Sequence, residues 1–256
     1  MSSELLLPLP PKPSITLRSP FVVQVLDDIR LPIDDDALAE FAWFIREYPR
    51  IYRHHFDHAE WRLLEIYRKY ELMHREYSGK PIGGLWSVMN ENTSRVYWDF
   101  EAFLNGVGAA LDILARVVGT AYTEQTSPSF SKLCKKTHLS GYADTMRHAR
   151  DRWVNRMKDY RDCFVHYTCV DTMLHFHFDR SARGVVLRCR IPTNPNVRDL
   201  MRFRFSRRSD VLRYTISVFR NLRALDRAIA IQIKRNFKTG EYPKRINNLF
   251  VLGQRE

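Results

Sequence analysis

Apolar residues recur every three or four positions over long stretches of the chain, and this spacing predicts amphipathic helices. The clearest stretch covers residues 93–122, with the stripe Val96, Phe100, Phe103, Val107, Leu111, Leu114 and Val118. A second stripe follows Ser140, the expected N-cap: Tyr142, Met146, Ala149, Trp153, Met157, Tyr160 and Phe164. A third follows Ser209 and continues to Phe237: Leu212, Ile216, Phe219, Leu222, Leu225, Ile229 and Ile233.

The N-terminal quarter of the chain is less regular. Five prolines between Pro8 and Pro20 predict an extended arm. Residues 21–26, Phe-Val-Val-Gln-Val-Leu, are expected to form a short strand or to dock on the core as part of the arm. A helix should follow the acidic residues 34–36 and end at Pro49. Another helix is expected over residues 51–77, with an apolar face that includes Trp61, Leu64 and Leu72.

Beyond residue 171 the apolar spacing changes to two, which predicts strands. Residues 172–178 and 185–191 alternate in this way, and residues 179–184 between them predict a β-hairpin. Residues 202–205 are a candidate third strand. The expected fold class is mainly α, a helical bundle with a small antiparallel β-hairpin or meander and a basic C-terminal helix.

Three regions follow from these patterns. Residues 1–36 form the proline-rich arm and residues 37–170 the helical bundle. Residues 171–256 form the hairpin and the basic helix, packed on the bundle. At 256 residues the chain is long enough to bury a substantial core.

Positive charge is concentrated near the C-terminus. The chain carries a net charge of +12, and residues 197–256 account for most of it. Four cations repeat every seven residues along one flank of the last predicted helix: Arg213, Arg220, Arg227 and Lys234. Arg presents planar donors that suit phosphate, so these four residues are candidates for binding nucleic acid. The alternative is a solvated basic face. A membrane-surface role is disfavoured because this helix lacks Trp and carries a full core stripe.

Several classes of protein are disfavoured by missing signals. Four cysteines without a CxxC pair favour reduced thiols, and neither a signal peptide nor an 18-residue apolar run is evident. A soluble, cytoplasmic protein is therefore expected. No phosphate-binding, dinucleotide, Ser-hydrolase, zinc or calcium motif occurs, so we expect neither cofactor nor metal. His54 with His58, and His175 with His177, are spaced as metal ligands can be. The expected alternatives are a polar, partly exposed helix start for the first pair and an exposed hairpin face for the second.

The segment Arg161-Asp162-Cys163-Phe164-Val165-His166 is the main candidate for chemistry. The pattern of Arg followed by His after four to six residues occurs four times. Only this copy adds a polar residue after the Arg and apolar residues before the His, at the end of a helix containing Trp. The segment resembles the motif of the HEPN superfamily of helical-bundle proteins, and the helix order over residues 93–170 is similar too.

That resemblance implies a metal-independent endoribonuclease, since many members are ribonucleases and others are inactive binding modules. It also implies a homodimer, because relatives commonly build the site at a dimer interface. A toxin or defence effector with a regulatory protein partner would fit the family.

The chemistry is consistent with these residue types. An imidazole near neutral pKa can remove the proton from a ribose 2′-OH, so His166 is the expected general base or acid. Arg161 can stabilise the charge that grows on the phosphate oxygens, and Asp162 can orient either residue. Five residues on a straight α-helix rotate by about 140° net. Arg161 and His166 therefore converge only if the helix breaks near Cys163, or if two chains meet about a two-fold axis.

Three alternatives remain open at this stage. Arg161 could pair with a carboxylate of the bundle while His166 acts as a cation near a helix C-terminus. The protein could be a non-catalytic module that binds RNA, DNA or a protein through its basic helix. It could also be a structural subunit of a larger complex, without affinity for nucleic acid.

Overall fold

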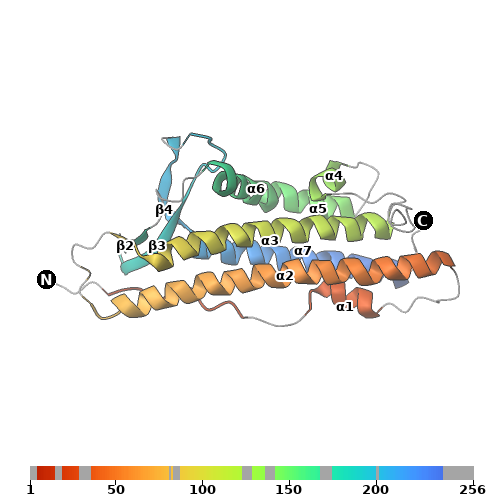
Figure 1. Cartoon of the computed structure of the whole chain (residues 1–256), viewed down its shortest axis with the longest axis horizontal. Helices are drawn as coiled ribbons and strands as arrows, with labels where there is room; N and C mark the ends of the chain where they lie inside the picture. The colour runs from red at the N-terminus through yellow and green to blue at the C-terminus, as the bar shows by residue number, and fades with distance from the viewer. Residues whose placement is uncertain are drawn as a thin grey trace. The chain divides into compact units, whose positions relative to one another are not determined.

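The structure is a computed structural model that describes residues 5–14, 19–28, 36–80, 82, 87–122, 129–135, 142–167, 175–199 and 202–238. It is mainly helical with a small antiparallel sheet, as expected (Figure 1). Its helices are α1 (Phe21–Asp28), α2 (Asp36–Tyr77), α3 (Glu91–Tyr122), α4 (Phe130–Lys135), α5 (Tyr142–Ala149), α6 (Asn155–Asp162) and α7 (Val211–Lys238). Two π-helical turns, η1 (Arg150–Val154) and η2 (Cys163–Tyr167), follow α5 and α6. The strands are β1 (Ser87–Val88), β2 (Phe176–Ser181), β3 (Gly184–Pro192) and β4 (Phe205–Asp210).

The chain divides into two compact units, each assembled from three separate segments. The first unit consists of Met1–Thr16, His58–Asn105 and Arg156–Arg220. The second consists of Leu17–Asp57, Gly106–Asn155 and Asn221–Glu256. Helices α2, α3 and α7 each contribute one part to each unit. These units differ from the three regions predicted from the sequence, because each unit combines segments that are far apart along the chain.

The first unit contains the sheet, whose strands are ordered β1-β2-β3-β4 with antiparallel neighbours. The ring of Tyr70 on α2 packs edge-on against Phe176 of β2, at 5.1 Å between centroids. The N-terminal arm extends this sheet, since Leu7 N donates to Val185 O at 2.7 Å and Val185 N donates to Leu5 O at 3.0 Å.

Gly184 allows the arm to approach β3. Its φ is +135°, a region that favours glycine, and a Cβ atom there would lie 2.6 Å from Leu5 O. The hairpin turn itself is shorter than the sequence pattern predicts, because β2 continues to Ser181 and β3 begins at Gly184. Residues 172–174 of the predicted first strand lie outside the described residues.

The second unit contains α1, whose buried face is Val22, Val23 and Leu26. The expectation of a strand at residues 21–26 is wrong. The β-branched run favours a strand locally. However, the carboxylate of Asp226 on α7 accepts hydrogen bonds from Phe21 N and Val22 N, and these are two of the N–H groups that a helix start leaves unpaired.

Helix α2 continues through Pro49, although the sequence predicted that it would end there. Proline removes one backbone hydrogen bond and costs about 3 kcal/mol in a helix interior. On either side of Pro49, Tyr48 and Tyr52 are buried, and their packing offsets this cost. The two helices predicted on either side of Pro49 are therefore one helix of 42 residues.

The predicted stripes of the other long helices form the core. Every stripe residue listed above for α3 and α7 is buried, as are Met146, Ala149, Trp153, Met157, Tyr160 and Phe164. The predicted cap Ser140 and the side chain of Tyr142 lie outside the described residues. Ser209 does not cap α7, because Asp210 accepts the Arg213 N–H at 3.1 Å.

One helix is long and apolar enough to cross a membrane, by length and composition only. The stretch Glu91–Gly119 of α3 has a mean hydropathy of 1.4 in its most apolar window. However, 72% of that window is buried inside the structure, as in the core helix of a soluble protein.

Candidate functional site

The Arg161–His166 segment lies where α6 widens into the π turn η2. A π turn closes through i→i+5 bonds and takes one more residue than an α turn. It therefore reduces the offset of about 140° that a straight α-helix would impose on Arg161 and His166. The helix does not break near Cys163, one of the two routes expected for convergence, because it widens at that residue into a π turn.

Two apolar residues anchor this turn. Cys163 is fully buried, and the ring of Phe164 packs against Tyr97 and Phe100 of α3, with centroids 6.1 and 5.1 Å apart. The following residues, Val165 and His166, are exposed. The turn is thus fixed on one side and open to solvent on the other.

Asp162 holds Arg161. Its Oδ1 atom accepts Nε and Nη2 of Arg161, at 3.0 and 2.7 Å. Both side chains are partly exposed, at 35% for Arg161 and 46% for Asp162. The structure therefore brings two of the three predicted catalytic residues together. The meeting of Arg161 with His166 in one pocket stays a prediction.

The four predicted phosphate-binding cations are all exposed on α7. Arg213 and Arg220 belong to the first unit, and Arg227 and Lys234 belong to the second. Arg227 also lies over the ring of Phe21, at 5.7 Å from the centroid.

The histidine pairs are engaged in other contacts. His58 Nε2 accepts a hydrogen bond from Arg62 Nε at 3.3 Å, and His54 packs edge-on against His55. His175 and His177 are half-buried rather than exposed. Burial, together with the charge of Arg190, lowers the pKa of His177 to about 4. Among the described residues, no three His, Cys, Asp or Glu side chains are grouped as metal ligands would be.

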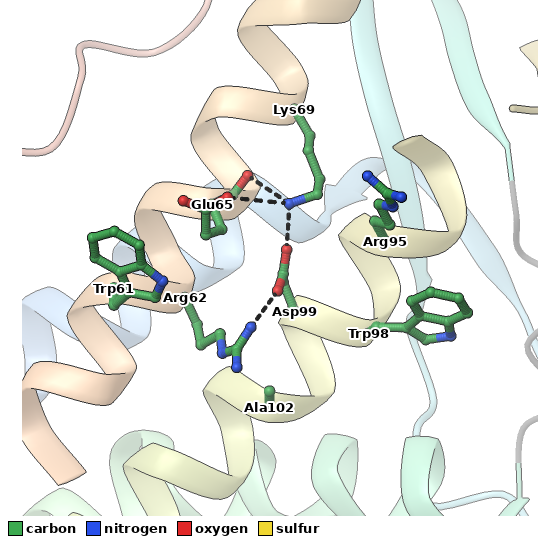
Figure 2. A pocket seen from close by; sticks show the side chains of 8 residues that line it. All are labelled: Trp61, Arg62, Glu65, Lys69, Arg95, Trp98, Asp99 and Ala102. Carbon is green, nitrogen blue, oxygen red and sulfur yellow. Dashed lines mark hydrogen bonds and ion pairs between the residues drawn. The ribbon is translucent and has the colours of Figure 1, made fainter. Parts of the chain in front are cut away.

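A groove in the first unit was not predicted from the sequence. It lies between α2 and α3, has a volume of about 590 Å³, and is lined by Trp61, Arg62, Glu65, Lys69, Arg95, Trp98, Asp99 and Ala102. Figure 2 shows the indole rings of Trp61 and Trp98 on opposite sides of the charged side chains. Trp61 is 53% exposed and Trp98 is 58% exposed.

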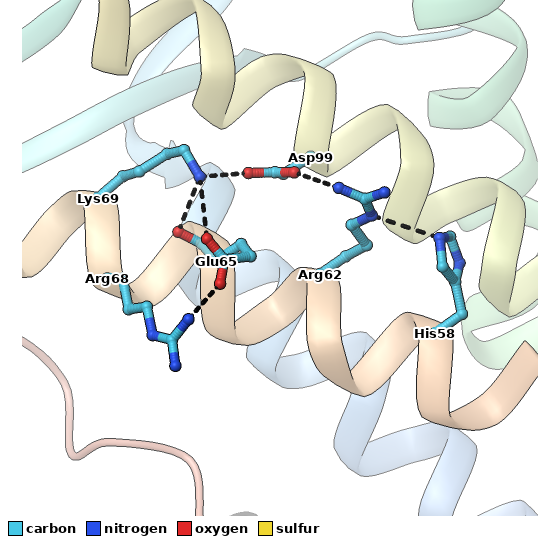
Figure 3. Close-up of polar contacts among 6 residues, drawn as sticks. All are labelled: His58, Arg62, Glu65, Arg68, Lys69 and Asp99. Carbon is cyan, nitrogen blue, oxygen red and sulfur yellow. Dashed lines mark hydrogen bonds and ion pairs between the residues drawn. The ribbon is translucent and has the colours of Figure 1, made fainter.

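Charged residues form the centre of this groove. Asp99 is buried and accepts hydrogen bonds from Arg62 Nη1 at 2.9 Å and Lys69 Nζ at 2.6 Å (Figure 3). Lys69 also lies 3.5 Å from a carboxylate oxygen of Glu65, which in turn pairs with Arg68. The cations outnumber the carboxylates, so the groove keeps a positive charge.

The placement of Trp61 corrects the sequence analysis, which assigned it to the apolar face of its helix together with Leu72. Both are exposed. The buried stripe of α2 runs instead through Tyr52, Phe56, Ala59, Leu63, Ile66, Tyr70 and Met73. Trp61 lies two residues past Ala59, and Trp98 lies two residues past Val96, which turns each about 200° away from the core. The offset of each tryptophan from the buried stripe can be read from the sequence, and it would have identified both residues as exposed.

Comparison of the chain with protein-family models, with curated proteins and with solved structures finds no match. The resemblance to the HEPN superfamily is therefore carried by the Arg161–His166 segment and the helix order alone.

Proposed function

We propose that this protein is a metal-independent endoribonuclease, with its site at the Arg161–His166 segment. The observation that carries the proposal is the π turn η2, which is anchored by Cys163 and Phe164 and presents His166 to solvent. A homodimer that brings two such segments together about a two-fold axis is part of the proposal.

In the proposed cleavage of RNA, His166, Arg161 and Asp162 have different roles. His166 takes the proton of a ribose 2′-OH, and the freed oxygen attacks the adjacent phosphorus. The bond from phosphorus to the 5′-oxygen breaks, and that oxygen takes up a proton. The products are a 2′,3′-cyclic phosphate and a 5′-OH end. Arg161 stabilises the charge on the non-bridging oxygens through its guanidinium, which Asp162 keeps in position.

The test is cleavage of end-labelled single-stranded RNA by the purified full chain in EDTA. Loss of a general base or acid typically costs about 10²–10⁴-fold in rate, and we expect this for His166→Ala. For Arg161→Ala we expect a loss of about 10²-fold or more. DNA of the same sequence should not be cut, because it lacks the attacking hydroxyl.

Matched controls are available on the same helical run. His148→Ala and Arg152→Ala remove an exposed imidazole and an exposed guanidinium outside the segment, and both variants should cleave like the wild type. Absence of cleavage by the wild type, or equal cleavage by His166→Ala, would contradict the proposal.

A second candidate function, non-catalytic binding of nucleic acid, is favoured by the exposed cations on α7. Phosphate binding weakens steeply with salt, and each contact to a single strand contributes about 0.7 to the logarithmic slope. Arg213→Ala with Arg220→Ala, and Arg227→Ala with Lys234→Ala, should each reduce that slope by about 1.4. Under this function His166→Ala would bind like the wild type. Unchanged slopes in both double variants would remove α7 from the interface.

A further inference from the structure

The two exposed tryptophans of the α2–α3 groove have no role in the fold described above. Trp is among the residues that proteins most often place at binding hot spots, since a large apolar side chain exposed to water is unfavourable. Trp61 and Trp98 are each more than half exposed, although their helices contribute well-filled stripes to the core. Two such residues flanking one groove indicate a surface that receives a ligand.

The cations of the groove are already oriented. Arg62 is held at two points, by Asp99 and by His58, and neither bond uses its Nη2 atom. Lys69 is held by the same carboxylate of Asp99. Because Asp99 is buried beneath them, these cations are positioned before any ligand arrives.

The outer cations are held more loosely. Arg95 pairs with Glu91, and both side chains are exposed, at 51% and 73%. Arg68 pairs with Glu65 and lies 5.4 Å from the centre of the Trp61 ring. A pair that is exposed on both sides, as Arg95–Glu91 is, contributes little free energy, so an incoming phosphate can replace Glu91.

From this arrangement we infer that the groove binds single-stranded nucleic acid, with bases stacked on Trp61 and Trp98 and phosphates at the cations between them. A single strand alternates planar bases with anionic phosphates, and the groove alternates indole rings with cations in the same way. In a duplex the bases are stacked inside and do not reach the rings. An acidic peptide would match the cations but offers no flat rings to the tryptophans.

This inference rests on the proposed function for RNA as the natural ligand, and it adds that the RNA is unpaired. The stacking itself does not need a 2′-OH, so a single strand of DNA should bind as well. That property separates binding in the groove from cleavage at Arg161 and His166.

The test is fluorescence anisotropy of a labelled 12-nucleotide oligo-dT with the full chain. Loss of one stacking partner weakens binding by roughly 5- to 100-fold, and we expect this for Trp61→Ala and for Trp98→Ala. Trp61→Phe and Trp98→Phe keep an aromatic face and should retain most of the affinity. Leu72→Ala removes an equally exposed apolar side chain of α2 outside the lining of the groove, and should bind like the wild type.

Folding is checked by the melting temperature, which should not fall in any of these variants because the replaced side chains are exposed. A duplex of the same length should bind without dependence on either tryptophan. Equal affinity of the wild type and both Ala variants for oligo-dT overturns the inference. Tryptophan-dependent binding of poly-Glu instead of oligo-dT overturns it in favour of an acidic protein partner.

The two proposals fail in different ways. Oligo-dT bound through the tryptophans without cleavage of RNA rejects the nuclease and leaves the groove assignment intact. Cleavage of RNA that depends on His166, without binding of oligo-dT through Trp61 or Trp98, does the reverse.

Discussion

Each of the two units contains a buried carboxylate beside a tyrosine of α2, and the two differ in how they are satisfied. Asp210 in the first unit is 3% exposed, and Asp226 in the second is 1% exposed. Burial raises the pKa of each to about 6. Asp210 lies beside Tyr70, and Asp226 lies beside Tyr52.

Asp210 joins three elements of its unit. It accepts hydrogen bonds from the hydroxyl of Tyr70 on α2 at 2.5 Å, from Cys189 N on β3 at 3.1 Å, and from Arg213 N on α7 at 3.1 Å. It therefore fastens the sheet to two helices while capping one of them.

Asp226 joins two elements. It accepts Phe21 N at 2.6 Å and Val22 N at 3.2 Å, and so caps α1 from α7. The hydroxyl of Tyr52 is buried beside Asp226 and makes no hydrogen bond of ordinary length and angle among the described residues. Burial and the nearby charge of Asp226 raise the pKa of Tyr52 well above its usual range. A buried carboxylate therefore stabilises the fold only as far as its hydrogen-bond donors are in place. The same pair, Asp beside Tyr, is well bonded in the first unit and less well bonded in the second.

We expect the greatest loss of stability from Asp210→Ala. This variant leaves the Tyr70 hydroxyl and the Arg213 N–H without their acceptor, and the Cys189 N–H keeps only the Tyr70 oxygen, at 2.8 Å. Each unsatisfied buried donor costs about 1–3 kcal/mol, so we expect a loss of about 3–5 kcal/mol in the free energy of unfolding. Asp226→Ala leaves the backbone N–H groups of Phe21 and Val22 without an acceptor, and the first of these bonds is only part-buried, so we expect about 2–3 kcal/mol. Urea denaturation followed by circular dichroism measures both. A loss in Asp226→Ala that equals or exceeds the loss in Asp210→Ala would contradict the larger structural role of Asp210.

The second prediction concerns pH. The pKa of each carboxyl is about 6 in the folded state against 3.8 unfolded, so the folded state binds more protons between these values. The stability contributed by each group is complete below about pH 4 and is lost as pH rises through 6. The loss is on the order of 3 kcal/mol per group.

Asp210→Asn and Asp226→Asn should each flatten this fall, whatever their effect on stability at one pH. The free energy of unfolding between pH 4.5 and 7.5 is the measurement, and the slope difference from the wild type is the quantity to compare. A slope unchanged by either variant would contradict the raised pKa of that group.

Next in size is the contrast between the two tyrosines. Tyr70→Phe removes the hydrogen bond to the Asp210 carboxylate, which contributes about 1.5–3 kcal/mol, and also removes the oxygen that accepts the Cys189 N–H at 2.8 Å. Tyr52→Phe removes a buried hydroxyl that makes no hydrogen bond of ordinary length and angle, so its effect should lie within about 0.5 kcal/mol of zero or be stabilising. Equal destabilisation by the two substitutions would show that Tyr52 also donates to its carboxylate.

The long apolar stripes were predictable from the sequence because burial imposes the period of the helix on them. Every stripe residue of α3 and α7 is buried. Helix α1 was not predictable, because its first N–H groups are satisfied by Asp226, 205 residues away from Phe21. The cap at Asp210 was misassigned by one residue, since Ser209 and Asp210 are both good caps by residue type.

Of the two candidate sites, one was predictable from the sequence and the other was not. Arg161, Asp162 and His166 are close in sequence, so a local pattern could propose them together. The groove was missed because Asp99 on α3 meets Arg62 and Lys69 of α2 only once two helices are in register. Sequence spacing carries no information about such a register, although the phase of Trp61 and Trp98 relative to the core was readable.

The last prediction, for which we expect a small effect, concerns the contact between Arg227 and Phe21 at the start of α1. Arg227 lies over the ring of Phe21, the residue whose N–H reaches Asp226, and both side chains are exposed at that point. An exposed cation–π contact contributes about 0.5–1 kcal/mol, so Arg227→Ala should lower the free energy of unfolding by no more than that. A double-mutant cycle with Phe21→Ala measures the coupling between the two side chains. A coupling near zero would mean that Asp226 alone holds the start of α1. A loss above about 2 kcal/mol in Arg227→Ala would mean that this arginine is structural, and its role as a phosphate contact would then have to be judged from Lys234 instead.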